Sequence, residues 1–331
     1  MKGTVRNKTE ILVLLIENDR IMDNCNYTFL LPAFKTTYLQ EAILSIKNQS
    51  FSDFRVIVSD DASPYDIKTI FDITCGDDER FSYRRNEINI GSKSLVSHWN
   101  QLVDMCSTEY LIMASDDDIY DIHFLKEIDK LVQKYPNVNI FRAKAQRIVN
   151  ENIDVKDGNI PEFLEQADFL QFFGEKKMVH CLANYVFRTN ELKKNGYFPD
   201  FPKAAKSDSA AAMLMSKKGI AITRQILFTF RISSTNLSSP QNYNKYSEEG
   251  LVSCIMFADW FKNNIKPYIN YSERIKNAHY HHVTDVALFF LNNLSITKSF
   301  KYLYKLWIRG FISFRFLATV VKNRIIKWSK E

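Results

Sequence analysis

The chain has 331 residues, 46% of them hydrophobic and 25% charged, so it can bury a full core and is not a disordered protein. Its five cysteines are scattered and form no C-x-x-C pair, which argues against a disulfide framework or a zinc knuckle. The net charge is +6, yet residues 298–331 hold nine basic residues against one acid, so the rest of the chain is slightly acidic.

The first half of the chain alternates short apolar runs with amphipathic stretches. Apolar and β-branched runs predict strands, whereas apolar residues three or four positions apart predict helices. The predicted order is strand 27–34, helix 38–49, strand 54–59, helix 65–74, strand 81–84, helix 94–106, strand 110–114 and helix 124–135. This alternation predicts an α/β fold with a mainly parallel sheet, in which ligands bind at the carboxyl ends of the strands.

Two of the predicted strands end in acidic residues. The strand at 54–59 leads into Asp60, and the strand at 110–114 leads into three aspartates at 116–118. A single aspartate there is commonly a turn or capping residue. Three in succession repel one another, a cost that a bound cation removes, and oxygen ligands without nearby His or Cys favour Mg²⁺ or Mn²⁺. Because these ions often share ligands with phosphates, we expect a phosphorylated or nucleotide-linked substrate.

Long stretches of the sequence resemble the family 2 glycosyltransferases. In TFLLPAFKTTYLQEAILSIKNQSFSDFRVIVSDDAS, residues 28–63, a strand ends in a Pro-containing loop, a Y-L-x-E-A-I-x-S-I-x-x-Q helix follows, and the second strand ends in D-D-x-S. The resemblance continues through NEINIGSKSLVSHWN at 86–100 and the acidic run. It ends with FPDFPKAAKSDSAAAMLMSKKGIAITRQILFTFRISSTNLS at 198–238.

The resemblance implies a GT-A fold, with helices flanking a nucleotide-binding sheet. It also implies transfer of a sugar from a nucleotide diphosphate donor, a UDP-sugar above all, to an acceptor hydroxyl with inversion at the anomeric carbon. The catalytic domain would span residues 27–238, between an N-terminal extension at 1–26 and a C-terminal helical region at 239–331.

The resemblance assigns several residues to the donor site. Asp60 would hydrogen-bond the nucleobase, and Pro32, Ala33 and Phe34 would line the nucleoside pocket. The other residues expected near the donor are Asn86, Lys93, Asp116 and Arg231.

The acidic run matches the metal-binding motif of the family in two registers. Read as D-x-D, it offers Asp116 and Asp118. Read from the residues that follow, it puts Ser115 in place of the first acid and makes Asp117 the main ligand, which we favour. Asp116, Asp117 and Asp118 are thus all candidate ligands of Mn²⁺ or Mg²⁺, which would neutralise the departing diphosphate. Where many relatives place a further histidine ligand, this chain has Arg231, so either the metal has fewer protein ligands or Arg231 neutralises phosphate.

An inverting transfer needs a carboxylate that takes the proton from the attacking hydroxyl. Asp208 is the only acid in KAAKSDSAAAMLMSKKG, residues 203–219, and it matches the base position of the family. It also precedes an apolar helical run at 210–215, so a helix-capping role is the structural alternative. The two roles are compatible because a capping position fixes the carboxylate.

The C-terminal stretch separates basic from apolar residues on a helical wheel. Lys298, Lys301, Lys305 and Arg309 fall on one side. The opposite side holds Phe300, Leu303, Trp307, Phe311, Phe314 and Val321. This pattern is typical of a helix that lies in a membrane interface without spanning it, although a helix packed on the catalytic domain is the alternative.

We therefore expect residues 298–330 to bind an anionic membrane surface. Because the apolar stretch at 11–16 is too short for an export signal, we expect a cytoplasmic protein on the inner face of the inner membrane. The acceptor would be a glycan or lipid-linked glycan in surface polysaccharide synthesis. No nucleic acid partner is expected, since the rest of the chain has no net positive charge.

Two other functions fit parts of the sequence. A metal-dependent nucleotidyltransferase commonly has a Gly-rich phosphate loop near its N-terminus, but no glycine lies between Gly3 and Gly76. A non-catalytic nucleotide- or sugar-binding module would not need Asp208. The histidines at 279, 281 and 282 lack the i, i+4 spacing of a metal site on a helix and suggest a structural role.

Overall fold

The computed structural model describes residues 25–234, 236, 239, 245–270, 272–273, 275–276 and 294–328, without the side chains of 296 and 323–328. Most of the expected N-terminal extension and the three histidines at 279, 281 and 282 lie outside the described residues.

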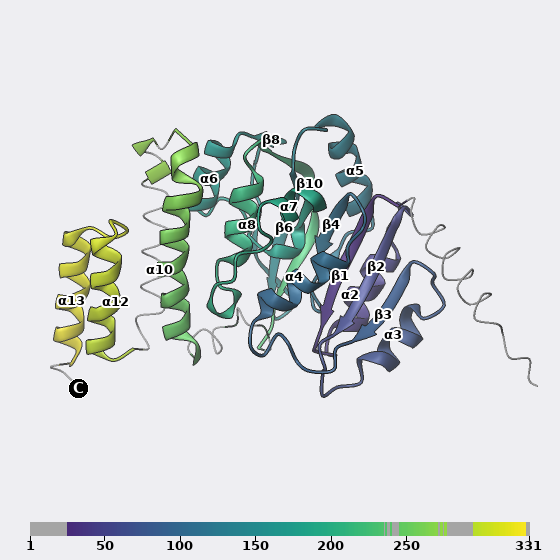
Figure 1. Ribbon diagram of the computed structural model, residues 1–331, viewed down its shortest axis with the longest axis horizontal. Coiled ribbons are helices and arrows are strands. Elements are labelled where there is room, and N and C mark those ends of the chain that lie inside the picture. The colour runs from purple at the N-terminus through teal and green to yellow at the C-terminus, as the bar shows by residue number, and fades with distance from the viewer. Residues whose placement is uncertain are drawn as a thin grey trace, which may run out of the picture.

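Ten strands form one sheet in the centre of this part of the chain (Figure 1). The strands are β1 (Tyr27–Ala33), β2 (Phe54–Asp60), β3 (Phe81–Arg85), β4 (Tyr110–Met113), β5 (Ile119–Tyr120), β6 (Ile140–Val149), β7 (Asn152–Lys156), β8 (Phe163–Leu164), β9 (Tyr185–Arg188) and β10 (Ile220–Ile232). Their order is β3-β2-β1-β4-β9-β6-β10-β5, with β7 on β6 and β8 on β10.

Helices cover the sheet and continue beyond it. The α-helices are α2 (Leu39–Lys47), α3 (Ile67–Cys75), α4 (Leu95–Met105), α5 (Phe124–Lys134), α6 (Gln166–Gly174), α7 (Thr189–Lys194), α8 (Ser207–Met215), α10 (Ser247–Asn264), α12 (Ile296–Ile308) and α13 (Phe314–Trp328). The described residues also form three short 3₁₀ helices: η1 (Leu182–Asn184), η2 (Pro202–Ala204) and η3 (Lys266–Tyr268).

All eight elements predicted up to residue 135 are present, with ends shifted by a few residues at most. Parallel pairing, as predicted, joins β3, β2, β1 and β4, and it also joins β6 to β10. Strand β9 runs antiparallel to both of its neighbours, and β5, β7 and β8 also pair antiparallel, so the whole sheet is mixed. Strands β6 and β7, for example, are joined by a two-residue turn, which an antiparallel pair permits and a parallel pair does not.

The pairing register brings the predicted ligand-binding segments together. Ala33 at the end of β1 lies opposite Asp60 at the end of β2, and Leu30 of β1 lies opposite Met113 of β4. The Pro32 loop therefore leaves the sheet between the two acidic strand ends, as expected for the carboxyl edge of parallel strands.

Each face of the sheet carries its own apolar cluster. On one face the ring of Tyr120 packs edge-on against Phe29 and Phe124, with centroids 5.2 and 4.7 Å away. On the other face Phe187 packs against Phe198 with centroids 5.5 Å apart, together with residues of α4, α6 and α8. Burial on both faces explains why β1 and β2 are nearly continuous apolar runs.

The C-terminal helices extend the molecule away from the sheet. Phe257 and Phe261 of α10 join the second apolar cluster, whereas Leu251 of the same helix packs with Leu303 of α12. Figure 1 shows α12 and α13 side by side beyond α10, at the end of the molecule opposite β3 and α3. The tail is thus a helical hairpin instead of one amphipathic helix, because the chain turns at Gly310, whose φ is +75°.

Candidate active site

Asp60 lies completely buried at the end of β2. One carboxylate oxygen accepts the backbone N–H of Ser63 at 2.8 Å. The other accepts the hydroxyl of Tyr83 at 2.7 Å and pairs with Arg85. Burial and this hydrogen bond raise the pKa of Tyr83 to about 12. A nucleobase that hydrogen-bonds Asp60 has to displace Arg85, whose side chain is about half exposed.

The neighbouring Asp61 organises the loop after β3. Its carboxylate accepts the side-chain amide of Asn86 at 2.8 Å and the backbone N–H groups of Ile90 and Gly91 at 2.9 and 2.7 Å. A Cβ on Gly91 would lie 2.8 Å from this carboxylate, so glycine permits the close approach. Asn86, expected near the donor, is therefore engaged with Asp61, while Lys93 is exposed.

Asp116 ties the Pro32 loop to the end of β4. One of its oxygens accepts the backbone N–H groups of Phe34 and Lys35 at 3.0 and 2.8 Å. The other lies 3.0 Å from the Lys35 ammonium group, which also contacts the carboxylate of Asp117. Although burial alone would lower it, the charges of Asp116 and Asp117 raise the pKa of Lys35.

Asp117 and Asp118 have different environments. Asp117 contacts Lys35 through one oxygen and accepts the Ser115 hydroxyl with the other. Asp118 is only 1% exposed; its oxygens accept the backbone N–H of Arg231 at 2.9 Å and lie 3.6 Å from the Cys181 thiol. Burial and the charge of Asp117 raise the pKa of Asp118 well above its usual range. Asp118 thus connects β10 to the acidic motif.

The guanidinium of Arg231 in β10 contacts the acidic motif through a backbone carbonyl. Its Nε donates to the backbone carbonyl of Asp117 at 3.2 Å. Its other nitrogens pair with Glu41 of α2, at 2.7 Å, and with Glu151 in the β6–β7 turn. The guanidinium also lies 4.1 Å from the centre of the Tyr38 ring. Phosphate neutralisation by Arg231 stays a prediction, and it requires one of these glutamates to release the guanidinium.

Asp208 lies in the first turn of α8, after a strained loop. Lys203, Ala204 and Lys206 have φ angles of 57°, 54° and 78°, a conformation that residues with a Cβ adopt at a cost and that recurs at functional sites. The carboxylate of Asp208 accepts the backbone N–H of Ser209 at 2.6 Å and lies 3.0 Å from Nε2 of His180.

The surroundings of Asp208 favour its deprotonated form. Burial alone would raise its pKa, but the charge and hydrogen bond of His180, together with the Ser209 N–H and the charge of Lys206, lower the pKa of Asp208 overall. The carboxylate retains partial contact with solvent, its side chain being 23% exposed.

A two-residue segment connects the candidate base to the acidic motif. His180 contacts Asp208, and the adjacent Cys181 lies 3.6 Å from Asp118. Burial and the charges of Asp118, Asp208 and Asp117 raise the pKa of the Cys181 thiol, as expected where these carboxylates converge.

Sequence reasoning assigned no role to Lys35 or His180. The sequence could have indicated Lys35, because it is the one cation in the Pro32 loop and that loop lies beside the acidic strand ends. His180 is 28 positions from Asp208 along the chain and lies outside every motif, so no sequence signal indicated it.

The acidic motif fits a divalent cation only in part. Oxygens of Asp116 and Asp117 face the same ammonium group, so one cation already lies between them. Mg²⁺ and Mn²⁺ commonly use one or two carboxylates and complete their shell with water and phosphates. Within the described residues there is no cluster of three or more His, Cys, Asp or Glu side chains that could hold a metal. These residues therefore fit a cation that the diphosphate helps to bind.

Comparison with known proteins finds similarity to glycosyltransferases. Residues 28–188 match the sequence model of "Glycosyl transferase family 2". A GalNAc(5)-diNAcBac-PP-undecaprenol beta-1,3-glucosyltransferase of Campylobacter jejuni is 34% identical over 90 residues, which are 27% of this chain and 28% of that protein. The match thus spans little more than a quarter of the length of that relative.

Solved structures share the architecture at low sequence identity. TarS residues 1–349 from S. aureus, in complex with UDP-GlcNAc, has a TM-score of 0.55 and 13% identity over 91% of this chain and 92% of that one. The mannosyltransferase PcManGT from Pyrobaculum calidifontis, in complex with GDP-Man and Mn²⁺, has a TM-score of 0.53 and 13% identity over 95% and 87%. Residues 28–188 therefore resemble glycosyltransferase family 2, and the fold is the GT-A fold that the motifs predicted.

Proposed function

We propose that the protein transfers a sugar from a nucleotide diphosphate donor, most favourably a UDP-sugar, to an acceptor hydroxyl with inversion. The observation that carries this proposal is the connection between Asp208 and the acidic motif through His180 and Cys181. A general base and a diphosphate-binding edge are the two parts that an inverting transfer requires at one place.

The chemistry divides between these two parts. Asp208 takes the proton of the acceptor hydroxyl while the acceptor oxygen forms a bond to the anomeric carbon and the bond from that carbon to the diphosphate breaks. A divalent cation would neutralise the leaving diphosphate. Asp117, with Asp116 beside it, would hold this cation, and Lys35 is placed to add positive charge. Because Asp118 is only 1% exposed and binds the backbone N–H of Arg231, the proposal leaves Asp118 with a structural role.

Nucleotide binding tests the donor class. We expect UDP with Mn²⁺ to raise the melting temperature of the protein more than GDP, CMP or dTDP, because a ligand that binds only the folded state stabilises it by mass action. The shift should disappear without Mn²⁺ and in Asp117→Ala. Asp121→Ala, which changes an exposed aspartate just after the motif, should respond as the wild type does. No shift with any nucleotide would contradict the donor assignment.

We further propose that the α12–α13 hairpin binds a membrane surface. None of the described helices is long and apolar enough to span a membrane. The hairpin exposes a mostly aromatic patch, which we define as Phe300, Tyr304, Trp307, Ile308 and Phe314. The side chains of Tyr304 and Phe314 are 55% and 65% exposed. Aromatic side chains of this kind favour the membrane–water interface.

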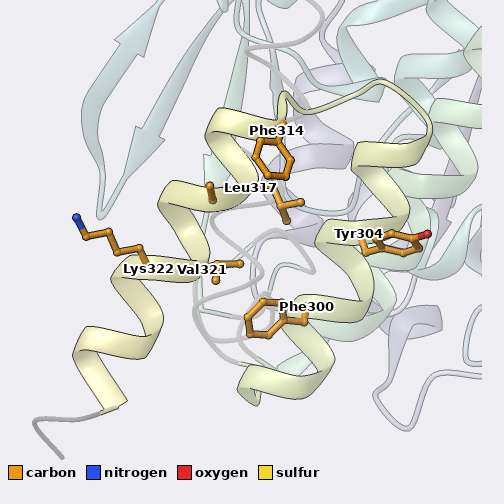
Figure 2. Close-up of a pocket in the computed structure, with 7 residues that line it drawn as sticks. Phe300, Tyr304, Phe314, Leu317, Val321 and Lys322 are labelled. Carbon is orange, nitrogen blue, oxygen red and sulfur yellow. The ribbon is translucent and has the colours of Figure 1, made fainter.

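An apolar groove of about 590 Å³ lies between the two helices (Figure 2). Phe300 and Phe314 line it with Leu317 and Val321, and Lys322 extends outward at its edge. Apolar side chains beside lysine suit the acyl chains and the anionic headgroups of lipids.

Two of the four basic residues expected to face the membrane instead bind α10. Lys298 lies 2.6 Å from Glu248, and Arg309 lies 2.8 Å from Asp259. Lys301, Lys305, Arg315 and Lys322 remain as the cations for a lipid surface among the described side chains of the hairpin. A lipid-linked glycan on the cytoplasmic face is the acceptor that this location favours, in agreement with the undecaprenol-linked substrate in the name of the C. jejuni relative.

A further inference from the structure

His180 lies at the centre of a chain of hydrogen bonds that ends on the candidate base. Its Nε2 is 3.0 Å from an oxygen of Asp208 and 3.1 Å from the Ser209 hydroxyl. Its Nδ1 is 3.0 Å from the hydroxyl of the buried Tyr185. An imidazole that donates its Nε2 proton to Asp208 turns Nδ1 towards the Tyr185 hydroxyl, which can act as donor or acceptor.

A buried ion pair fixes the backbone next to His180. Arg142 and Asp157 lie 2.7 Å apart and neither side chain is exposed. Asp157 accepts the backbone N–H of Val179 at 2.6 Å, and Arg142 donates to the carbonyl oxygen of Val179. The ring of His180 also packs edge-on against Phe173, with centroids 4.8 Å apart. The imidazole therefore has a defined position and is held there by groups that do not touch Asp208.

We propose that His180 is a positioning residue that holds the Asp208 carboxylate in the orientation needed to accept the proton of the attacking hydroxyl. This inference rests on the proposed function. One oxygen of Asp208 is fixed by Ser209, and His180 fixes the other, so the carboxylate cannot rotate away from the acceptor. In many active sites a third side chain holds the catalytic base in the correct orientation. Here a histidine would do this for a carboxylate.

The charged and titratable groups around Asp208 determine its pKa, which is the quantity that the test measures. They are His180, Lys206, Cys181 and Tyr185. Because the charge and hydrogen bond of His180 both lower the pKa of Asp208, removal of the imidazole should raise this pKa. The acid limb of activity would then move to higher pH, which a purely structural histidine would not cause.

The test compares His180→Leu, which fills the space without a donor, with His180→Gln, which keeps one. The pKa of Asp208 is measured by NMR titration in protein labelled at aspartate carboxyl carbons, with the signal assigned by its loss in Asp208→Asn. Release of UDP from UDP-GlcNAc and from UDP-glucose, with water as acceptor, is followed against pH. His123→Leu is the matched control, because His123 is an exposed histidine that hydrogen-bonds Ser50.

We expect His180→Leu to raise the pKa of Asp208 and to lower kcat at least tenfold at an unchanged KM for the donor, with the acid limb at higher pH. His180→Gln should recover much of the rate. An Asp208 pKa that is the same in wild type and His180→Leu, or an equal kcat, would overturn the proposal. If the wild type releases no UDP from either sugar, the donor assignment fails, whereas the NMR titration still decides whether His180 acts on Asp208.

Discussion

At the scale of single residues, Asp208 is the side chain on which the proposed catalysis would depend most directly. We expect Asp208→Asn to lower the turnover of a nucleotide sugar by roughly 10²–10⁴-fold, the usual contribution of a general base. Binding of UDP, measured by calorimetry, should change little because Asp208 is outside the nucleotide edge. Asp200→Asn is the matched control, since Asp200 is exposed and hydrogen-bonds Ser94. Normal turnover by Asp208→Asn would instead support a non-catalytic binding module.

The sequence could indicate candidate site residues that lie inside motifs. It could not indicate the residues that hold those side chains in place. Asp60, the acidic run and Asp208 occur at recognisable positions relative to predicted elements, so their chemistry suggested a role. Asp61 holds a loop and His180 holds a carboxylate, and both roles depend on contacts between segments 25 or more positions apart. Such contacts leave no local pattern, so only the three-dimensional arrangement reveals them.

At the scale of elements, the buried Arg142–Asp157 pair joins β6 to the segment that carries His180. Asp157→Ala would leave Arg142 buried without its charge partner, which we expect to cost about 3–5 kcal/mol of the free energy of unfolding. Asp154→Ala breaks an exposed pair with Arg147 and should cost about 1 kcal/mol or less. Urea unfolding of the two variants measures the difference; equal losses would mean that burial of the pair adds nothing.

For most elements of the first half of the chain, the periodicity of apolar residues was sufficient to predict the secondary structure. The first eight elements have strong apolar patterns, and their order was predicted correctly. Strand β5 has two residues, too few for an alternation to be recognised. The C-terminal wheel identified apolar and basic faces, but it treated 298–321 as one continuous helix and so could not anticipate the contacts of Lys298 and Arg309 with α10.

At the scale of the whole molecule, the hairpin is the part expected to meet a membrane. Trp307→Ser combined with Phe314→Ser should reduce binding to liposomes that contain anionic lipid by at least tenfold in a sedimentation assay, because both rings are accessible. Replacing Lys301 and Lys305 by Glu should weaken binding further at low salt. Ile73→Ser, at an exposed apolar position on the distant α3, is the control. Unchanged binding in the aromatic variant would rule out this surface.

Helix α10 contacts both the active site and the hairpin. Phe257 packs on Phe201, and the Ser253 hydroxyl donates to the carbonyl oxygen of Ala205, in the loop just before Asp208. Glu248 and Asp259 of the same helix bind the first and last turns of α12. A protein resting on a bilayer through its hairpin would therefore keep Asp208 at a constant height above the lipid headgroups. Only an acceptor whose terminal sugar reaches that height above the membrane could then be extended. The distance from the membrane would thus set the length of the acceptor.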